Sequence, residues 1–137
     1  MLKKGLVALA LASLSIIMVC FCLPQVSIAG DILGDVSVRA VPENWGGRCP
    51  HTFKFNGVVQ VNGPGTFNYH WVRSDGAKSA VQIVTVRKGQ RVVHVHDTWS
   101  IGAKGMKIDI SQTLYVNSGS QHLNAHSNTI PINCMNR

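Results

Sequence analysis

The stretch GTFNYHWVRSDG, residues 65–76, combines the alternation of a β-strand with a turn signal at its end. Successive side chains of a strand point to opposite faces, so Phe67, Tyr69 and Trp71 share one face while His70 lies on the other. The closing Ser-Asp-Gly triplet is typical of a turn. We therefore predict a core strand of a β-sandwich here, with the three aromatic residues packed inward.

Similar period-2 segments, separated by turn residues, continue through the rest of the chain. Residues 117–128 are rich in Ser, Asn and His and are expected to form a loop or a ragged strand end. Seven short strands in about 108 residues predict an all-β, immunoglobulin-like antiparallel sandwich. The expected strands are 35–41, 52–61, 66–73, 80–87, 91–99, 106–111 and 129–134.

The first 29 residues have the features of an export signal. Two lysines precede an uncharged, largely apolar segment over 5–23, and Ser27 and Ala29 place small residues at positions −3 and −1 of a cleavage site. We predict a helical signal peptide over 1–29 and one domain over 30–137, exported to the periplasm or secreted. The apolar segment is also close to the length that spans a bilayer, so an uncleaved membrane anchor is the alternative.

Cysteine usage agrees with export. Cys20 and Cys22 fall in the leader, which leaves Cys49 and Cys134 as a pair for which a disulfide is the default in an oxidising compartment. In an immunoglobulin-like sandwich the first and last strands run parallel and end at the same pole, where the second strand begins. Cys49 starts the second expected strand and Cys134 ends the last, so the two should meet at that pole.

Three motifs extend this interpretation to a family. The motifs are CPxTxKFxG from Cys49, NGPG from Asn62 and YxWxRSDG from Tyr69. Together they resemble a family of small bacterial exported proteins with an immunoglobulin-like (fibronectin-III-like) domain and no assigned activity. The resemblance covers roughly residues 36–134. It implies the fold and export, and it supplies no catalytic residues.

Two histidines spaced two residues apart, His94 and His96, should share the outward face of their strand. Neutral imidazoles in this arrangement can bind zinc or copper when a third ligand is near. His70 is the candidate third ligand, and His122 and His126 are the other possibilities. The alternative is a solvent-exposed strand face on which histidine is simply a tolerated polar residue.

Charge and an isolated tryptophan suggest partner contacts. Removal of the leader lowers the formal net charge from +7 to +5. Arg87, Lys88 and Arg91 are the densest group of cations, in an expected hairpin loop, and would suit an acidic glycan; ordinary surface charge is the alternative. Trp45 lies in an Asn-Trp-Gly-Gly loop, where it could contact a sugar or a partner, or cover the end of the sandwich near the disulfide.

Common catalytic motifs are absent from the sequence, which contains no Gly-x-Ser-x-Gly, His-Glu-x-x-His or phosphate-binding loop. We expect a non-enzymatic binding or structural module of the envelope or extracellular space that needs no cofactor. Its expected partner is an envelope or extracellular protein or a glycan rather than nucleic acid, with membrane contact only through an uncleaved leader. A periplasmic zinc- or copper-binding protein and an acidic-glycan adhesion module are the alternatives.

Overall fold

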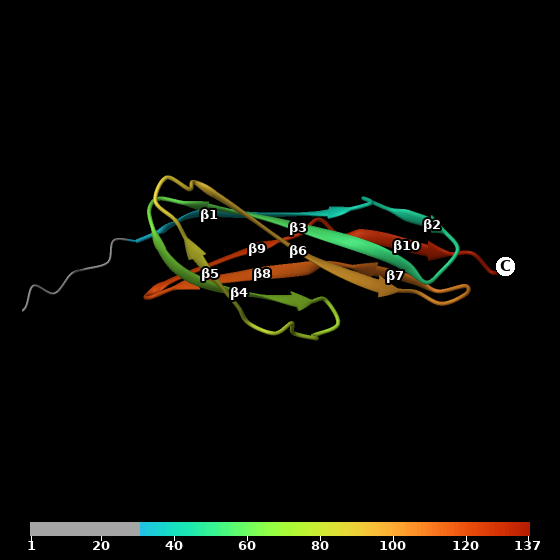
Figure 1. The fold of residues 1–137 in the computed structure, drawn as a ribbon. Coiled ribbons are helices and arrows are strands. Elements are labelled where there is room, and N and C mark those ends of the chain that lie inside the picture. Colours follow the sequence, from blue (N-terminus) through green and yellow to red (C-terminus); the bar gives the residue numbers. More distant parts are fainter. Residues whose placement is uncertain (1–30) are drawn as a thin grey trace, which may run out of the picture.

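The computed structural model describes residues 31–137, so the expected signal peptide over 1–29 lies outside the described residues. The described part is all-β, and it contains no helix long and apolar enough to cross a membrane. Its strands, shown in Figure 1, are β1 (Leu33–Val41), β2 (Trp45–Gly47), β3 (His51–Val61), β4 (Gly65–Arg73), β5 (Gln82–Val86), β6 (Val92–Ile101), β7 (Lys107–Ile110), β8 (Gln112–Ser118), β9 (Gln121–His126) and β10 (Ile130–Cys134).

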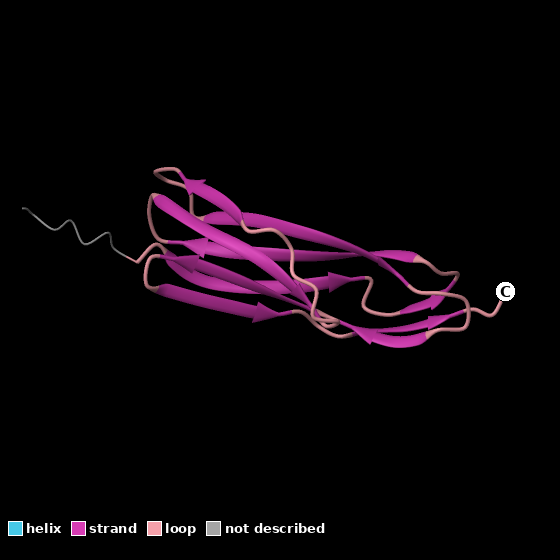
Figure 2. Ribbon diagram, turned by 90° about the horizontal axis from the view of Figure 1, so that it is seen from below, coloured by secondary structure: helices cyan, strands magenta, loops and turns pink. Residues whose placement is uncertain are grey.

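The strands form two main layers and a small third sheet. One layer has the strand order β1-β3-β6, the other has the order β5-β4-β8-β9, and the small sheet has the order β2-β10-β7. Figure 2 shows the strands running along the length of an elongated molecule, joined by loops. This is the immunoglobulin-like antiparallel sandwich that the alternating pattern predicts.

The small sheet continues strands of the two layers. β2 follows β1 along the chain, β10 follows β9, and only Ser111 separates β7 from β8. In this sheet β10 runs parallel to β2, with Cys134 opposite Gly47, and antiparallel to β7. The expected first strand, β1, therefore does not itself pair with the last; the parallel partner of β10 is β2, and the expected loop around Trp45 is wrong because residues 45–47 form this short strand. We call this end of the sandwich the disulfide pole.

Alternation along the strands builds the core between the layers. β3 buries Phe53 and Phe55 completely, and β4 leaves only 2% of Phe67 and of Trp71 exposed. Leu114 of β8 packs in the same cluster. Each large apolar side chain buried in this way contributes about 1.5–3 kcal/mol to folding. The inward placement predicted for the aromatic residues of 65–76 is confirmed, with Tyr69 half-buried.

The prediction of a loop over 117–128 is wrong. β8 extends to Ser118 and β9 begins at Gln121, so Gly119 and Ser120 form a two-residue hairpin loop. Gly119 has a φ of +56°, a value that such tight hairpin loops require. The polar residues lie on the solvent-facing side of a strand whose other side is half-buried, so polarity here marks an exposed strand face. Together with β2 and the division at Ser111, β9 accounts for ten strands instead of seven.

Candidate functional site

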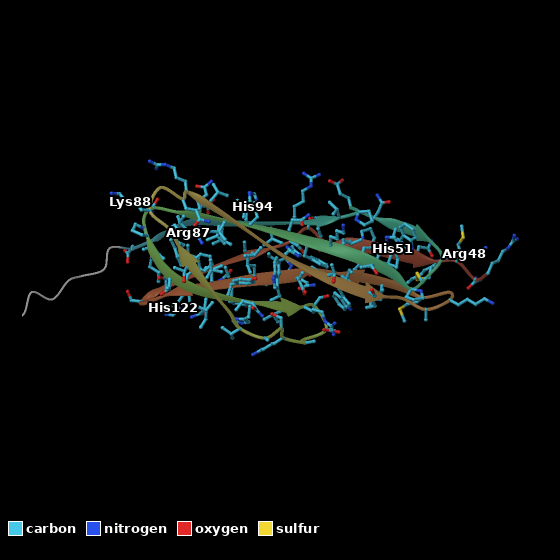
Figure 3. The ribbon with its side chains drawn as sticks, viewed as in Figure 1. Arg48, His51, Arg87, Lys88, His94 and His122 are labelled. Carbon is cyan, nitrogen blue, oxygen red and sulfur yellow. A yellow bond between two sulfur atoms is a disulfide. The ribbon has the colours of Figure 1, made fainter. Side chains whose placement is uncertain are left out.

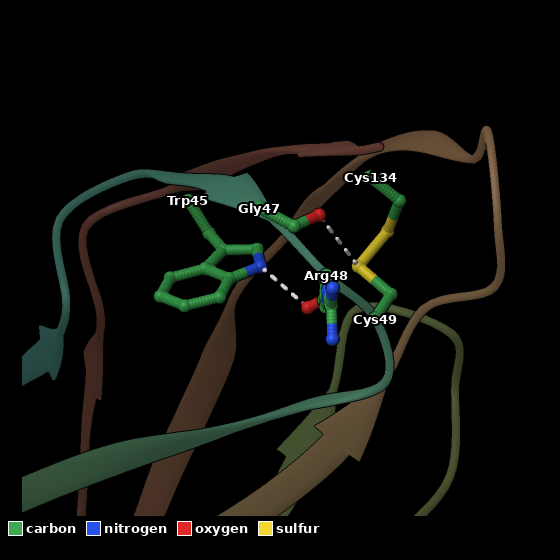
Figure 4. The surroundings of a disulfide bond; sticks show 5 residues. All are labelled: Trp45, Gly47, Arg48, Cys49 and Cys134. Carbon is green, nitrogen blue, oxygen red and sulfur yellow. Dashed lines mark hydrogen bonds between the residues drawn. A yellow bond between two sulfur atoms is a disulfide. The ribbon is translucent and has the colours of Figure 1, made fainter. Parts of the chain in front are cut away.

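The disulfide pole contains the predicted Cys49–Cys134 bond, with Cα atoms 5.6 Å apart and a sequence separation of 85 (Figure 4). Gly102 lies against it. A Cβ atom at this position would be 2.8 Å from Sγ of Cys49 and 2.9 Å from Sγ of Cys134, and the φ of Gly102 is +112°. The bond ties the start of β3 to the end of β10, which confirms the pairing expected from topology.

Trp45 covers the same pole. Its ring stacks on His51 with centroids 3.5 Å apart, and its Nε1 donates a hydrogen bond of 3.2 Å to the carbonyl of Arg48 (Figure 4). His51 in turn meets the edge of Phe53 at 5.0 Å. These contacts match the interpretation of Trp45 as a cover over the end of the sandwich. Contact between Trp45 and a partner stays a prediction.

The three histidines considered as metal ligands are not brought together. His94 and His96 lie on β6, opposite Val58 and Asn56, and point outward from the β1-β3-β6 sheet. His70 lies on β4 in the other layer and points outward on the opposite side of the sandwich. Within residues 31–137 no group of three His, Cys, Asp or Glu side chains is placed to hold a metal ion.

The cations Arg87, Lys88 and Arg91 lie in the exposed loop between β5 and β6, as the sequence predicts. Arg87 and Lys88 are labelled in Figure 3. Gly89 turns this loop with a φ of +86°. The carbonyl of Arg91 accepts a 2.8 Å hydrogen bond from the amide of Val61, which fixes the loop on the main body. None of the three cations forms an ion pair with another described residue.

The outside of the β5-β4-β8-β9 sheet forms a continuous surface, which we call the polar face. Cross-strand register sets its residues in rows: His70 lies opposite Tyr115, and Tyr115 lies opposite Asn124. The next row joins Ile83, Asn68, Asn117 and His122. The residues of the polar face are Thr66, Asn68, His70, Val72, Ile83, Thr85, Thr113, Tyr115, Asn117, His122, Asn124 and His126.

Hydrogen bonds between neighbouring strands orient the polar side chains of this face. The Oδ1 atom of Asn117 accepts a bond of 2.6 Å from Nδ1 of His122, while its Nδ2 donates to Asn68 at 3.3 Å. Nδ1 of His126 bonds to the hydroxyl of Thr113 at 2.6 Å. Because Nδ1 is engaged in both histidines, Nε2 is the ring nitrogen left to face solvent. His122 is marked in Figure 3.

An aromatic pair occupies the middle of the polar face. The rings of His70 and Tyr115 are stacked, with centroids 5.2 Å apart and planes 8° from parallel. Tyr115 is 37% exposed. Nδ1 of His70 is buried without a hydrogen-bond partner among the described residues, so the ring is held by stacking. The pair forms an aromatic platform surrounded by amides, hydroxyls and imidazoles.

The polar face contains no Asp, Glu, Lys or Arg side chain. Arg73 is the one charged residue in the four strands of this sheet, and its guanidinium lies on the inner side, 4.6 Å from the ring centroid of Trp99. The outer face of the β1-β3-β6 sheet, in contrast, exposes Asp35, Arg39 and Lys54. The polar face can therefore recognise a ligand by hydrogen bonds and stacking rather than by ion pairs.

Sequence reasoning missed most of this surface. The sequence singles out only three of its histidines, His70, His122 and His126, and only as possible metal ligands, because residues 117–128 are expected to form a loop or a ragged strand end. The available signal was the alternation of Leu114 and Val116 with polar residues, followed by Gly119-Ser120 and the alternation of Leu123 and Ala125. That pattern is typical of a two-residue hairpin with one exposed face.

Comparisons with known proteins address the fold. No protein-family model matches the chain. No curated protein matches it either. Among solved structures, it is similar to a CARDB domain from Pyrococcus furiosus in complex with di-metal ions, with a TM-score of 0.52 and 10% sequence identity over 74% of this chain and 94% of that chain. At this identity the likeness shows the fold alone, an immunoglobulin-like β-sandwich.

Proposed function

We propose that the protein is an exported, non-enzymatic binding module that holds a neutral, hydroxyl-rich glycan on the polar face. The observation that carries the proposal is the exposed, charge-free surface with the stacked His70–Tyr115 pair at its centre. Side-chain amides pair with adjacent hydroxyls because each offers a donor and an acceptor in one plane. An aromatic ring can pack against the apolar face of a sugar ring.

Preorganisation supports the proposal. Asn117, Asn68 and His122 already bond to one another, so less side-chain freedom is lost when a ligand arrives. The extended rows across four strands suit a linear polymer better than a small enclosed molecule. The lack of known catalytic motifs in the sequence supports binding without turnover.

Export supports a glycan of the cell envelope or extracellular space as the partner. The leader over 1–29 has the composition of a signal peptide, and the Cys49–Cys134 bond suits an oxidising compartment. The metal ions named for the CARDB domain are not transferred to this chain. The histidines that would bind metal here lie on opposite outer faces of the sandwich.

The test is binding of the exported protein to a panel of insoluble neutral polysaccharides, measured by depletion from solution. We expect at least one member to retain the wild type, and Tyr115→Ala and Asn124→Ala to weaken retention at least tenfold. Asn56→Ala is the matched control, because Asn56 is an exposed asparagine on the opposite layer. No retention by any polysaccharide, or equal retention of all variants, would overturn the proposal.

An acidic glycan is the second candidate. It is favoured by Arg87, Lys88 and Arg91, which lie in one exposed loop without a carboxylate partner among the described residues. Binding through this loop should weaken as salt rises, because exposed charges are screened. Retention on heparin that persists after all three are changed to glutamine would reject this candidate, and retention lost only in that variant would favour it over the polar face.

A further inference from the structure

We infer that β5 is a docking edge for β5 of a second copy of this chain, so that two copies pair antiparallel and join their four-stranded sheets. β5 is an edge strand of the β5-β4-β8-β9 sheet. An edge strand presents a row of backbone N–H and C=O groups that another strand can pair with.

The apolar residues at this edge are unusually exposed. Ile83 is 78% exposed and Val81 is 60% exposed, the highest values among the large hydrophobic residues of the described chain. Ile83 lies opposite Asn68 and points outward, whereas Val84 and Val86 face the core side, and Val81 directly precedes the strand. Exposed aliphatic side chains beside a free strand edge are a known basis for association between chains.

On the other side of the sandwich, two backbone positions of the edge strand β1 are already bonded. The side chain of Gln121 accepts a 3.0 Å bond from the amide of Leu33 and donates a 3.1 Å bond to its carbonyl. Asn128 does the same for Ala40, at 2.8 and 3.3 Å. Two side-chain amides, one on the first residue of β9 and one just after its end, therefore bond to backbone positions of β1 that a second chain would need.

β6, the remaining long edge, contains a charge that β5 lacks. Asp97 of β6 is half-buried on the core side, where it lines an open hollow of about 310 Å³ together with Arg73 and Lys78. An inward-pointing charge in an edge strand disfavours pairing with another strand. The edges of the small sheet are only three and four residues long. β5 thus lacks the protections that β1 and β6 have, and it combines a free edge with the most exposed large apolar side chain of the described residues.

The sequence of β5 is compatible with self-pairing. Residues 82–86 read Gln-Ile-Val-Thr-Val and carry no charge, although the chain as a whole is basic. An antiparallel two-fold arrangement therefore sets no like charges opposite each other within the strand, and it buries Ile83 of both copies in one interface. A second copy of the chain brings the same uncharged strand, so its docking on β5 requires no additional feature of the molecule.

Pairing would also change how the polar face works. Two β5 strands joined edge to edge make one eight-stranded sheet, with the two polar faces side by side on the same surface. A polymer could then contact both, which raises the apparent affinity without a new contact. This consequence rests on the proposed function, whereas the dimer itself does not.

Sedimentation velocity of the exported protein, over concentrations up to about 1 mM, tests the dimer. We expect a concentration-dependent dimer for the wild type and at least a tenfold higher dissociation constant for Ile83→Lys. Val92→Lys is the matched control, because Val92 is 41% exposed at the edge of the other layer, and it should dimerise like the wild type. Circular dichroism checks that each variant is folded.

Hydrogen exchange locates the interface. Amides of residues 82–86 should gain protection as concentration rises, while those of 92–101 should not. A wild type that stays monomeric throughout the range overturns the inference, as does an Ile83→Lys variant that dimerises like the wild type. Because no glycan is present in these measurements, their failure leaves the polysaccharide-binding result unaffected.

Discussion

At the scale of single residues, Gln112 stands out in the core. Its side chain is completely buried, and neither Oε1 nor Nε2 has a hydrogen-bond partner among the described residues. Nε1 of Trp71, on the neighbouring strand, is also buried without a partner. Mutational data from proteins indicate that burying an unpaired amide lowers the free energy of unfolding by about 1–3 kcal/mol.

Replacing Gln112 with methionine should therefore stabilise the fold. Methionine has a similar shape and leaves no unpaired polar atom, so we expect the free energy of unfolding to rise by about 1–2 kcal/mol. Urea denaturation measures the change. Gln60→Met is the control at an exposed position of β3 and should alter stability by less than about 0.5 kcal/mol. A destabilised Gln112→Met variant would show that the buried amide makes favourable contacts.

Gly57 of β3 illustrates how closely the two layers approach. A Cβ atom there would lie 2.7 Å from Cδ2 of Leu114 and 2.8 Å from Cγ2 of Val95. Gly57→Ala should lower the free energy of unfolding by about 1–3 kcal/mol, because the core must shift to admit a methyl group. Gly46→Ala is the control, with no atom within 4 Å of the added carbon. Equal stability of the two variants in thermal unfolding would contradict the close packing.

Asp75 makes the contribution of the turn after β4 to folding stability depend on pH. The hydrogen bond from the amide of Ala77, together with Arg73, lowers the pKa of this carboxyl below its usual value. A lowered pKa in the folded state contributes stability above the unfolded pKa, near 4, and this contribution is lost as pH falls through the folded pKa. We expect Asp75→Asn to be less stable than the wild type at pH 7 and the difference to shrink below about pH 4. A difference that is constant with pH would contradict this.

At the scale of elements, strands with a buried face could be predicted and strands with polar residues could not. β3 and β4 alternate large apolar with polar residues, and their positions were anticipated to within one residue. β9 has Leu123 and Ala125 on its inner side, which bury little apolar surface and give a weak alternating signal. β9 is stabilised mainly by its pairing with β8, and the local sequence does not reveal such a contact between strands.

The disulfide links elements that are far apart in sequence. The Cys49→Ala/Cys134→Ala double variant should lose about 4 kcal/mol of stability, because an 85-residue separation closes a long loop in the unfolded chain. Urea denaturation of the oxidised wild type and the double variant measures the loss. The reduced wild type should resemble the double variant. An unchanged free energy of unfolding would contradict a structural role for the bond.

At the scale of the whole molecule, the two layers present different outer surfaces. One exposes Asp35, Arg39 and Lys54, and the other is free of charge and centred on Tyr115. Topology could be predicted far enough to bring Cys49 and Cys134 together, because it depends only on strand order. The polar face could not be predicted, because it needs the register of four strands at once, and a shift of one residue would turn every side chain to the other side.

The measurement that tests the central claim most directly is a map of amide chemical shifts with and without a soluble neutral polysaccharide that the protein retains. We predict that the amides and side-chain amide groups of Asn68, Asn117 and Asn124 shift together, with Tyr115. Residues of the opposite layer, such as Asn56 and His94, should not move. Shifts concentrated on that layer, or on the 87–91 loop, would contradict recognition by the polar face.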